Sequence, residues 1–129
     1  MIKNILIVDD EQEVLDVISE MLDSLGYRPF AAKRGSEALK LAKTTKFDLV
    51  ITDLIMPDMG GLAFAKKFKK QQKDTPIIVT AGVNLGKSNV DLEKYGVSAF
   101  IRKPFFIEEI DSKIKQLFAG KRELINFFG

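Results

Sequence analysis

The sequence predicts an α/β domain built around a mainly parallel β-sheet. Short apolar runs of strand length alternate with amphipathic helical patterns from one end of the chain to the other, which is typical of βα units. The 129 residues, of which 46% are hydrophobic, suffice for one domain with a conventional core. No internal repeat, low-complexity segment or interdomain linker interrupts this alternation. We therefore expect a single compact domain.

The first half of the chain contains three predicted strands and two predicted helices. Apolar runs predict strands over residues 5–8, 27–32 and 47–52. Apolar residues at helical spacing predict helices over residues 11–25 and 36–43.

Individual residues in this half refine the boundaries of the predicted elements. Pro29 has no N–H group to donate to a neighbouring strand, so the second strand should lie at or near an edge of the sheet. Gly26 follows the first helix at the position where a left-handed C-cap is expected. Asp9 or Asp10 is a candidate N-cap for the same helix.

The second half begins with a turn that contains Pro57, Gly60 and Gly61, and a third helix through Leu62 and Phe68 follows it. The remaining predicted elements are strands over residues 76–82 and 99–105 and a last helix over residues 107–118. The intervening segment, residues 84–96, has no clean period and carries glycines at its ends. We expect a short or mobile fourth helix there.

A small apolar cluster follows the last helix. It consists of Leu124, Ile125, Phe127 and Phe128, within the C-terminal extension 119–129. We expect the cluster to extend the last helix and pack on the body of the domain, and a partner-binding tail is the alternative.

The composition excludes several classes of function. The formal charge is only +2, with acidic and basic residues mixed along the chain, so we expect no direct binding to nucleic acid or to a membrane surface. The absence of cysteine and histidine removes thiolate and imidazole catalysis and the metal sites built from these residues. The apolar run at the start is too short for a signal peptide, and none is long enough to span a membrane, so a soluble cytoplasmic protein is expected.

Polar residues follow four of the predicted strands. Asp9 and Asp10 follow the first strand, Asp53 follows the third, Thr80 closes the fourth and Lys103 closes the fifth. In an open parallel sheet, ligand-binding groups lie outside the carboxyl ends of the strands, where the strand order reverses. If the first and third strands are neighbours, the three carboxylates converge at that point.

Three ionised carboxylates in one place repel each other unless a positive charge offsets them. Only hard oxygen ligands are available and only a few carboxylates would converge, so Mg²⁺, which keeps several waters, fits better than a caged Ca²⁺ or zinc. Lys103 can hold a phosphoryl oxygen, and Thr80 offers a hydroxyl donor beside it. An aspartate with a metal, a lysine and a hydroxyl around it is equipped for phosphoryl transfer, because its carboxylate can attack phosphorus while cations neutralise the transferred oxygens.

Each of these residues, taken alone, has an ordinary structural explanation. A strand-end aspartate such as Asp53 is more often a turn former or a cap, and Asp9 and Asp10 are both suitable N-caps. Lys103 fits a solvated loop, and Thr80 fits the interior of a strand. The functional interpretation therefore depends on all five residues falling at the ends of successive core strands.

Four motifs, in order VDDE, TDLIMPDMGG, VTAG and FIRKPF, resemble the response-regulator receiver domain of two-component signalling, and the resemblance covers residues 3–118. It implies a flavodoxin-like, doubly wound sheet of five parallel strands in the order 2-1-3-4-5, with helices on both faces. We accordingly expect residues 1–129 to form a single receiver domain.

The resemblance also implies a metal site and a phosphoacceptor. Asp53 would accept the phosphoryl group. Asp10, Asp53 and the backbone carbonyl of Ile55 would bind Mg²⁺, with Mn²⁺ able to take its place, and Asp9 would act through metal-bound water.

Four further roles follow from the same resemblance. Lys103 would hold the phosphoryl group, and Thr80 would move its hydroxyl toward it. Phe100 would swing inward with Thr80, and Pro104 is a candidate for the cis proline that aims the lysine. The protein would be no enzyme in the usual sense, although it would catalyse its own phosphorylation and dephosphorylation.

The partners implied are a sensor histidine kinase or phosphotransfer protein, and a downstream effector protein or domain. The output face would be formed by the fourth helix, the fifth strand and the fifth helix (residues 107–118), which is also a possible homodimer face. One departure concerns Gly82, which has no side chain to screen the phosphoryl group from water, although Ile55 could partly shield it. We therefore expect an accessible acyl phosphate.

Two alternative functions remain open. A pseudo-receiver would bind a partner without ever carrying phosphate, and failure to bind Mg²⁺ or accept phosphate would indicate it. An aspartate-based phosphohydrolase of the haloacid-dehalogenase type also attacks phosphorus with a strand-end aspartate, but its second aspartate stands two positions on, whereas Asp9 and Asp10 are adjacent. A nucleotide-binding role lacks a glycine-rich phosphate loop after the first strand.

Overall fold

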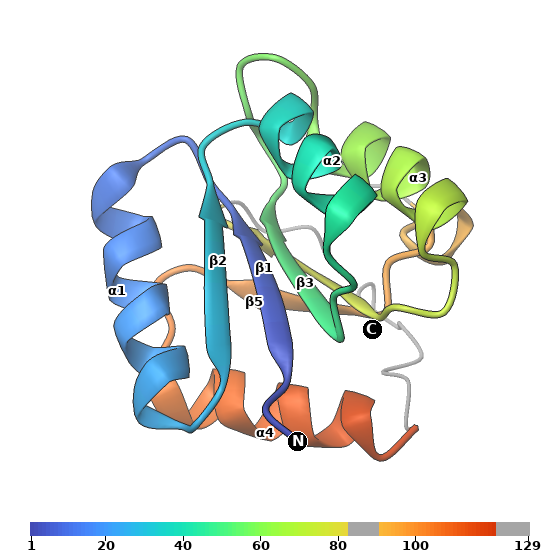
Figure 1. Ribbon diagram of the computed structural model, residues 1–129. Helices are drawn as coiled ribbons and strands as arrows, with labels where there is room; N and C mark the ends of the chain where they lie inside the picture. The colour runs from blue at the N-terminus through green and yellow to red at the C-terminus, as the bar shows by residue number, and fades with distance from the viewer. Residues whose placement is uncertain (83–90, 121–129) are drawn as a thin grey trace.

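Five strands form one parallel sheet in the order β2-β1-β3-β4-β5 in a computed structural model of the chain, which describes residues 1–82 and 91–120 (Figure 1). The strands are β1 (Asn4–Val8), β2 (Arg28–Ala32), β3 (Leu49–Asp53), β4 (Ile77–Ala81) and β5 (Ala99–Arg102). The expected fold class and strand order are confirmed. Pro29 lies in β2, which is at an edge of the sheet as expected. A residue without an N–H group is tolerated there because an edge strand has a neighbouring strand on one side only.

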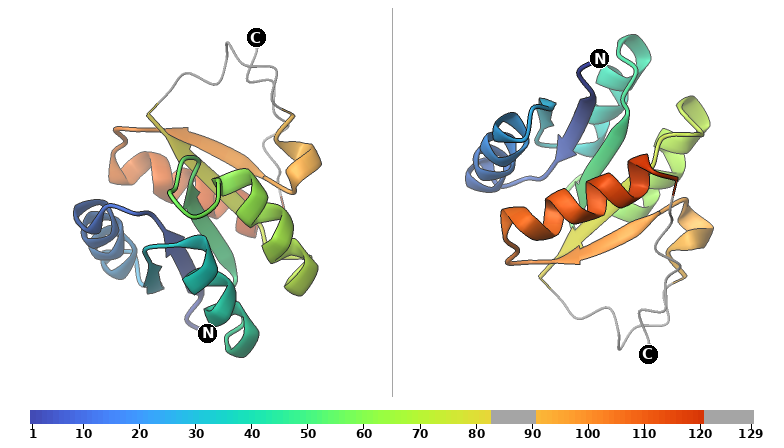
Figure 2. Two further views of the ribbon diagram at one scale, coloured as in Figure 1. Left: turned by 90° about the horizontal axis from the view of Figure 1, so that it is seen from above. Right: turned by 90° about the horizontal axis from the view of Figure 1, so that it is seen from below.

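Helices cover both faces of the sheet. They are α1 (Gln12–Ser24), α2 (Gly35–Thr44), α3 (Gly61–Gln71) and α4 (Ile107–Phe118), with a short 3-10 helix, η2 (Glu93–Tyr95), before β5. Figure 2 shows α1 and α4 together on one face and α2 and α3 side by side on the other. This is the doubly wound arrangement expected from right-handed βαβ connections.

The core consists of two layers because successive strand residues point to opposite faces. In β1, Ile5 and Ile7 pack with Leu15, Ile18 and Ile114 beneath α1 and α4. Leu6 and Val8 belong instead to the cluster beneath α2 and α3. The strands of this parallel sheet are thus apolar on both sides, and polar residues are confined to the strand ends.

The register of the sheet places those polar ends next to one another. Val8 pairs with Thr52, and Asp53 pairs with Thr80. Thr80 pairs in turn with Ile101 on β5. The residues that follow β1 and close β3 and β4 therefore meet at one edge of the sheet, its carboxyl end.

Two local expectations are wrong. The N-cap of α1 is Glu11 and not Asp9 or Asp10, and its side chain makes no capping hydrogen bond. Asp9 accepts a hydrogen bond from the Glu11 backbone N–H at 3.0 Å, but its carboxylate is otherwise directed to the strand ends, as described below. The strand β5 ends at Arg102, just before the expected end at Lys103 and Pro104; the Lys103 N–H still donates to β4, but Pro104 has no N–H to continue the ladder.

Gly26 follows α1 in the left-handed region, with φ of 91°, as the sequence predicted for a C-cap glycine. The expectation for residues 84–96 is only partly tested, since residues 84–90 lie outside the described part of the chain and η2 occupies the remainder. The apolar cluster at Leu124, Ile125, Phe127 and Phe128 also lies outside it.

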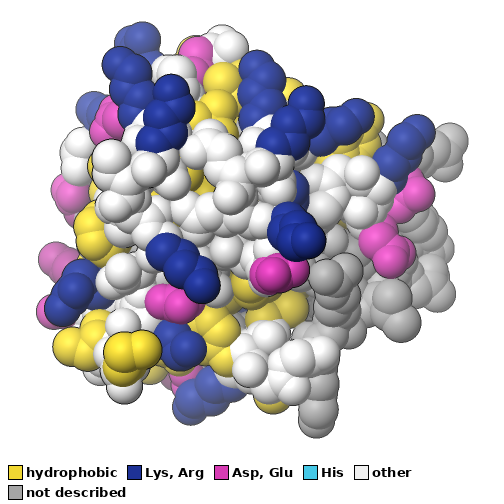
Figure 3. All heavy atoms as spheres, turned by 45° about the vertical axis from the view of Figure 1, so that its right-hand side comes forward, with side chains coloured by type: hydrophobic (Ala, Val, Ile, Leu, Met, Phe, Trp, Pro, Cys, Tyr) yellow, Lys and Arg dark blue, Asp and Glu magenta, His cyan; other side chains and the backbone are white. Residues whose placement is uncertain are grey.

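Charge is distributed unequally between the two helical layers. The helix α1 contains four acidic residues and no basic one, whereas α3 contains four lysines and no acidic residue. Figure 3 brings the side of α2 and α3 toward the viewer, and lysine and arginine side chains are spread across the visible face. Lys69 and Lys70 lie in the last turn of α3, where the helix dipole favours positive charge. Among residues 1–82 and 91–120, no helix has the length and apolar character needed to cross a bilayer.

Candidate functional site

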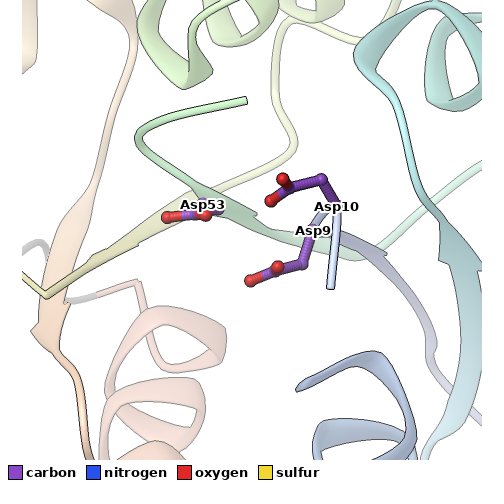
Figure 4. A group of neighbouring side chains, drawn as sticks. All are labelled: Asp9, Asp10 and Asp53. Atoms are coloured by element: carbon purple, nitrogen blue, oxygen red, sulfur yellow. The ribbon is translucent and has the colours of Figure 1, made fainter. Parts of the chain in front are cut away.

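Three carboxylates meet at the carboxyl end of the sheet. Asp9 and Asp10 follow β1, Asp53 ends β3, and each offers an oxygen atom within 4.8 Å of the other two (Figure 4). Asp9 is almost fully buried, Asp53 is partly buried and Asp10 is exposed. The structure therefore brings together the three acids that the sequence placed at strand ends.

Lys103 supplies the positive charge beside these acids. Its Nζ donates a hydrogen bond to Asp9 Oδ2 at 2.8 Å and lies 3.6 Å from Asp53 Oδ2. The Lys103 backbone N–H donates to the Ala81 carbonyl at 2.8 Å, which fixes the start of the side chain against β4. The peptide bond between Lys103 and Pro104 is cis, which confirms the expectation for Pro104.

Burial and charge act against each other on the ionisation of Asp53 and Lys103. Burial raises the pKa of Asp53 above its ordinary value, the Lys103 ammonium opposes that rise, and the Asp9 charge adds to it. Burial lowers the pKa of Lys103, but its hydrogen bond to Asp9 and the nearby negative charges outweigh burial and raise the pKa overall. Lys103 is therefore held as an ammonium, while the ionised form of Asp53 lacks full compensation.

Thr80 and Phe100 lie on the strands next to Asp53. The Thr80 side chain is buried, with its hydroxyl 3.5 Å from the Thr52 carbonyl oxygen, longer than an ordinary O–H···O hydrogen bond. Phe100 is half-buried and packs against the core layer beneath α2 and α3. Thr80 on β4 is thus one strand away from Asp53 on β3, and Phe100 on β5 is two strands away.

The loop between β3 and α3 begins directly after Asp53 and borders the site. Its residue Ile55 is 66% exposed, and the backbone N–H groups of Ile55 and Leu54 are close enough to the Asp53 carboxyl to oppose the rise of its pKa. At the other end of the loop, Gly61 has its backbone directly against the Asp53 carbonyl group, which leaves no room for a Cβ atom. The adjacent glycines in the sequence indicated a turn but not this close approach.

Sequence reasoning also missed Asp58, at the tip of the same loop. Its carboxylate accepts hydrogen bonds from the backbone N–H groups of Gly35 at 3.3 Å and Ser36 at 3.0 Å. Although the little burial it has raises the pKa of Asp58, the hydrogen bonds from Ser36 and Gly35 lower it more. No local sequence signal identifies this contact, because its partners lie 22 and 23 residues earlier.

Gly82, two residues after Thr80, and an apolar groove beside α1 border the site. Gly82 is exposed, and a Cβ atom built on it would meet nothing within 4 Å. On the side of α1, an apolar groove of about 490 Å³ begins at Lys103. Its lining residues are Glu11, Glu13, Val14, Val17, Ile18, Met21, Lys103, Pro104 and Phe105.

The donor set fits a small hard cation. All three side chains offer carboxylate oxygens, and the described residues place no sulfur or imidazole ligand in the group. Mg²⁺ is commonly held by one or two carboxylates while it keeps several waters, and the exposure of Asp10 leaves space for that water. An aspartate with a raised pKa, a neighbouring lysine and a cation site can support transfer of a phosphoryl group to the carboxylate.

Comparison with protein families gives one match that covers most of the chain. The family model described as response regulator receiver domain matches residues 5–115. Among individual proteins, the chain is 31% identical over 117 residues to the alkaline phosphatase synthesis transcriptional regulatory protein PhoP of Bacillus subtilis, a match that covers 91% of the chain and 49% of PhoP. It is also 31% identical to the response regulator SaeR of Staphylococcus epidermidis, covering 90% of the chain and 50% of SaeR. The chain thus spans about half the length of the curated relatives it matches.

Solved structures show the same architecture. The chemotaxis response regulator CheY4 of Vibrio cholerae aligns with a TM-score of 0.85 at 28% identity, over 91% of this chain and 99% of that one. The response regulator TrrA of Thermotoga maritima, solved in complex with Mg²⁺-BeF, aligns with a TM-score of 0.81 at 34% identity, over 90% of this chain and 99% of that one.

Proposed function

The chain belongs to the response regulator receiver domain family, and from that premise we propose that it is a signalling switch which accepts a phosphoryl group on Asp53. The donor would be the phosphohistidine of a sensor histidine kinase or of a phosphotransfer protein. An Asp53 carboxylate oxygen forms the new bond to phosphorus as the phosphorus–nitrogen bond of the donor breaks, and the donor imidazole leaves with the bonding pair. The cluster of Asp9, Asp10 and Asp53 beside Lys103 is the observation that carries this proposal.

Mg²⁺ fits this site as the cofactor, with Mn²⁺ able to replace it. Asp10, Asp53 and the Ile55 carbonyl would hold the ion, with Asp9 acting through bound water. The ion would neutralise charge on the transferred phosphoryl oxygens. In favour of this assignment are the hard oxygen donors gathered in this chain and the Mg²⁺-BeF complex of its structural relative TrrA.

Lys103 would hold the phosphoryl group from the other side. In the structure it pairs with Asp9 more closely than with Asp53, at 2.8 Å against 3.6 Å. A phosphoryl group on Asp53 would bring more negative charge to Lys103 than the carboxylate does, so the ammonium would move toward it and loosen its contact with Asp9.

Thr80 and Phe100 would convert phosphorylation into a conformational change. The Thr80 hydroxyl lies 3.5 Å from the Thr52 carbonyl, so it would lose only a weak hydrogen bond on moving toward a phosphoryl group. A hydrogen bond from Thr80 to the charged phosphoryl group would contribute about 1.5–3 kcal/mol. That energy shifts a two-state equilibrium by roughly tenfold to a hundredfold, so the active conformation would already exist as a minor population. Phe100 would move into the space that Thr80 leaves.

The output would appear on the expected face of the fourth helix, the strand β5 and the helix α4, where residues 83–90 of the fourth-helix segment lie outside the described part of the chain. A downstream effector protein or domain would bind there, and the same surface would serve a homodimer. We propose a cytoplasmic protein that binds neither nucleic acid nor membrane directly through this domain. It would be no enzyme toward other substrates, although it would promote its own phosphorylation and dephosphorylation.

The lifetime of the phosphoryl group would depend on how well water is kept away. Gly82 offers no side chain for this purpose, and no described residue lies within 4 Å of the place its Cβ atom would take. Ile55 stands on the other side with most of its surface exposed, so it gives partial cover. We therefore propose an acyl phosphate that hydrolyses readily.

Intact-mass measurement after incubation with acetyl phosphate tests the proposal. The wild type should gain one labile phosphoryl group in Mg²⁺ and none in EDTA, and Asp53→Ala should gain none in either condition. A wild type that binds Mg²⁺ but never gains mass would favour the phosphate-independent interaction module. Steady release of phosphate from simple phosphoesters would favour the phosphohydrolase.

A further inference from the structure

The loop that borders Asp53 is closed at its base by backbone contacts. Leu54 N–H donates to the Thr80 carbonyl at 2.8 Å, and Gly61 N–H donates to the Leu54 carbonyl at 2.7 Å. The Met56 side chain is buried and anchors the first half of the loop in the core. The second half runs from Pro57 to Gly60 with no side chain that is fully buried.

Asp58 fastens that second half to a different element. Its two carboxylate oxygens accept hydrogen bonds from the first two residues of α2, Gly35 and Ser36. The N-cap residue of α2, Arg34, makes no side-chain capping hydrogen bond. Asp58 therefore caps α2 from outside the helix, with a negative charge at the end of the helix where the dipole favours one.

Met59 adds a packing contact to the same junction. A Cβ atom on Gly35 would lie 2.7 Å from the Met59 Cγ atom, so the glycine allows Met59 to sit directly against the start of α2. Two neighbouring loop residues thus contact the same point of α2, one through hydrogen bonds and one through packing.

We propose that Asp58 is a positioning residue for the metal and phosphorylation site. By tying the loop to α2, it would restrict the backbone at Ile55, which lies two residues after Asp53 and, under the proposed function on which this inference rests, would supply a carbonyl oxygen to Mg²⁺. Gly60, at the end of the loop, has no Cβ atom to limit its backbone conformation, so the segment from Pro57 to Gly60 has more conformations available when Asp58 is released. Releasing it would spread the Ile55 carbonyl over orientations that do not bind the ion.

Asp58 itself is exposed and makes its contacts away from the acid cluster, so its effect on the ion would be exerted through the loop. A helix cap with only a structural role would change stability and leave metal affinity alone. A carboxylate acting through space would lose its effect whenever its charge is removed, whatever replaces it. These two alternatives define the variants needed for the test.

Isothermal titration calorimetry of the full chain with Mg²⁺ would compare the wild type with Asp58→Ala, Asp58→Asn and Asp48→Ala. The matched control is Asp48, which also accepts a backbone N–H from a distant residue, Asn4, at 2.7 Å, but at the amino end of the sheet. Asp58→Ala should bind Mg²⁺ about threefold to tenfold more weakly, the change expected for the loss of one or two ordinary hydrogen bonds. Asp58→Asn keeps an oxygen acceptor for Ser36 and should stay within about twofold of the wild type.

The control Asp48→Ala should lose stability toward urea while keeping the affinity of the wild type for Mg²⁺. Equal affinity for Mg²⁺ in Asp58→Ala and the wild type would overturn the inference, and so would equal weakening in Asp58→Asn and Asp58→Ala, which would indicate charge alone. Failure of the wild type to bind Mg²⁺ would instead overturn the metal site of the proposed function.

Discussion

Lys103 Nζ is hydrogen-bonded to Asp9 at 2.8 Å, although Asp53 Oδ2 lies only 3.6 Å away. Asp9 is 1% exposed and also accepts the Glu11 backbone N–H, so its charge is compensated by one ammonium and one amide. The lysine that would serve the phosphoryl group is therefore also the charge partner of the most buried acid in the site. Its removal should affect stability as well as chemistry.

Replacing Lys103 by Met should destabilise the domain in metal-free buffer. The substitution keeps the apolar length of the side chain and leaves Asp9 buried without a cation, which should lower the free energy of unfolding by about 1–3 kcal/mol. Urea unfolding in EDTA measures the change. Asp9→Asn combined with Lys103→Met should recover part of the loss, and equal stability of Lys103→Met and the wild type would contradict the pairing.

Replacing Asp10 by Ala should remove the effect of Mg²⁺ on stability without harming the fold. Asp10 is exposed, and its charge repels those of Asp9 and Asp53, so the variant should be as stable as the wild type in EDTA or more stable. The wild type should gain stability as Mg²⁺ is added, because a ligand that binds only the folded state stabilises it. Thermal unfolding with and without Mg²⁺ gives both results, and a variant less stable than the wild type in EDTA would refute the repulsion.

The stability of the metal-free protein should respond to pH through Asp53. Because burial raises the pKa of this carboxyl, the folded state holds its proton to higher pH than the unfolded state, whose value is near 3.8. Stability relative to Asp53→Asn should therefore fall as the pH rises from about 3.8 through the folded pKa, and level off above it. Lys103, whose folded pKa is also raised, loses its contribution only above its own unfolded value of 10.5, far outside this window.

Urea unfolding in EDTA between about pH 3.5 and pH 7 tests this dependence on Asp53. The difference in the free energy of unfolding, Asp53→Asn minus wild type, should increase with pH. A difference that decreases would mean that the Lys103 ammonium outweighs burial. Mg²⁺ affinity should also weaken toward acid pH, since protons and the ion compete for the same carboxylate.

Adjacent glycines should differ sharply in their tolerance of a methyl group. Gly61→Ala would force its Cβ atom against the Asp53 carbonyl, so the backbone at Asp53 or at the start of α3 must shift. A loss of about 1–3 kcal/mol in the free energy of unfolding is expected, together with weaker Mg²⁺ binding. Gly60→Ala places its Cβ atom 3.8 Å from the Leu54 carbonyl, an ordinary contact, and should change neither quantity appreciably. The comparison by urea unfolding and Mg²⁺ titration needs only these two variants.

The alternation of apolar runs and helical patterns was enough to predict the sheet and its layers. The three central strands β1, β3 and β4 are buried on both faces, so their apolar composition does not reveal which strands are neighbours. The resemblance supplied the strand order. The positions of Asp53 and Thr80 at strand ends followed from the same pattern, and their pairing across β3 and β4 places them together. What was predictable rests on features that repeat along the chain.

What escaped prediction depends on contacts between distant residues. Asp9 was a reasonable N-cap from its position, but its carboxylate accepts a hydrogen bond from Lys103, 94 residues later. Asp58 looked like a turn residue in a loop, and its function as a cap is visible only when α2 lies beside that loop. Gly61 was assigned to a turn, yet the close approach of the Asp53 backbone is the stronger reason for a glycine there.

The separation of charge between α1 and α3 gives the molecule an electric dipole directed across the sheet. A net charge of +2 conceals this, because four acidic residues on one layer face away from four lysines on the other. The electric field of a charged macromolecule would orient the domain before contact. A basic surface would therefore first meet the acidic helix α1, which lines the groove that begins at Lys103. The rate of such encounters, more than the strength of the final complex, should fall as ionic strength rises.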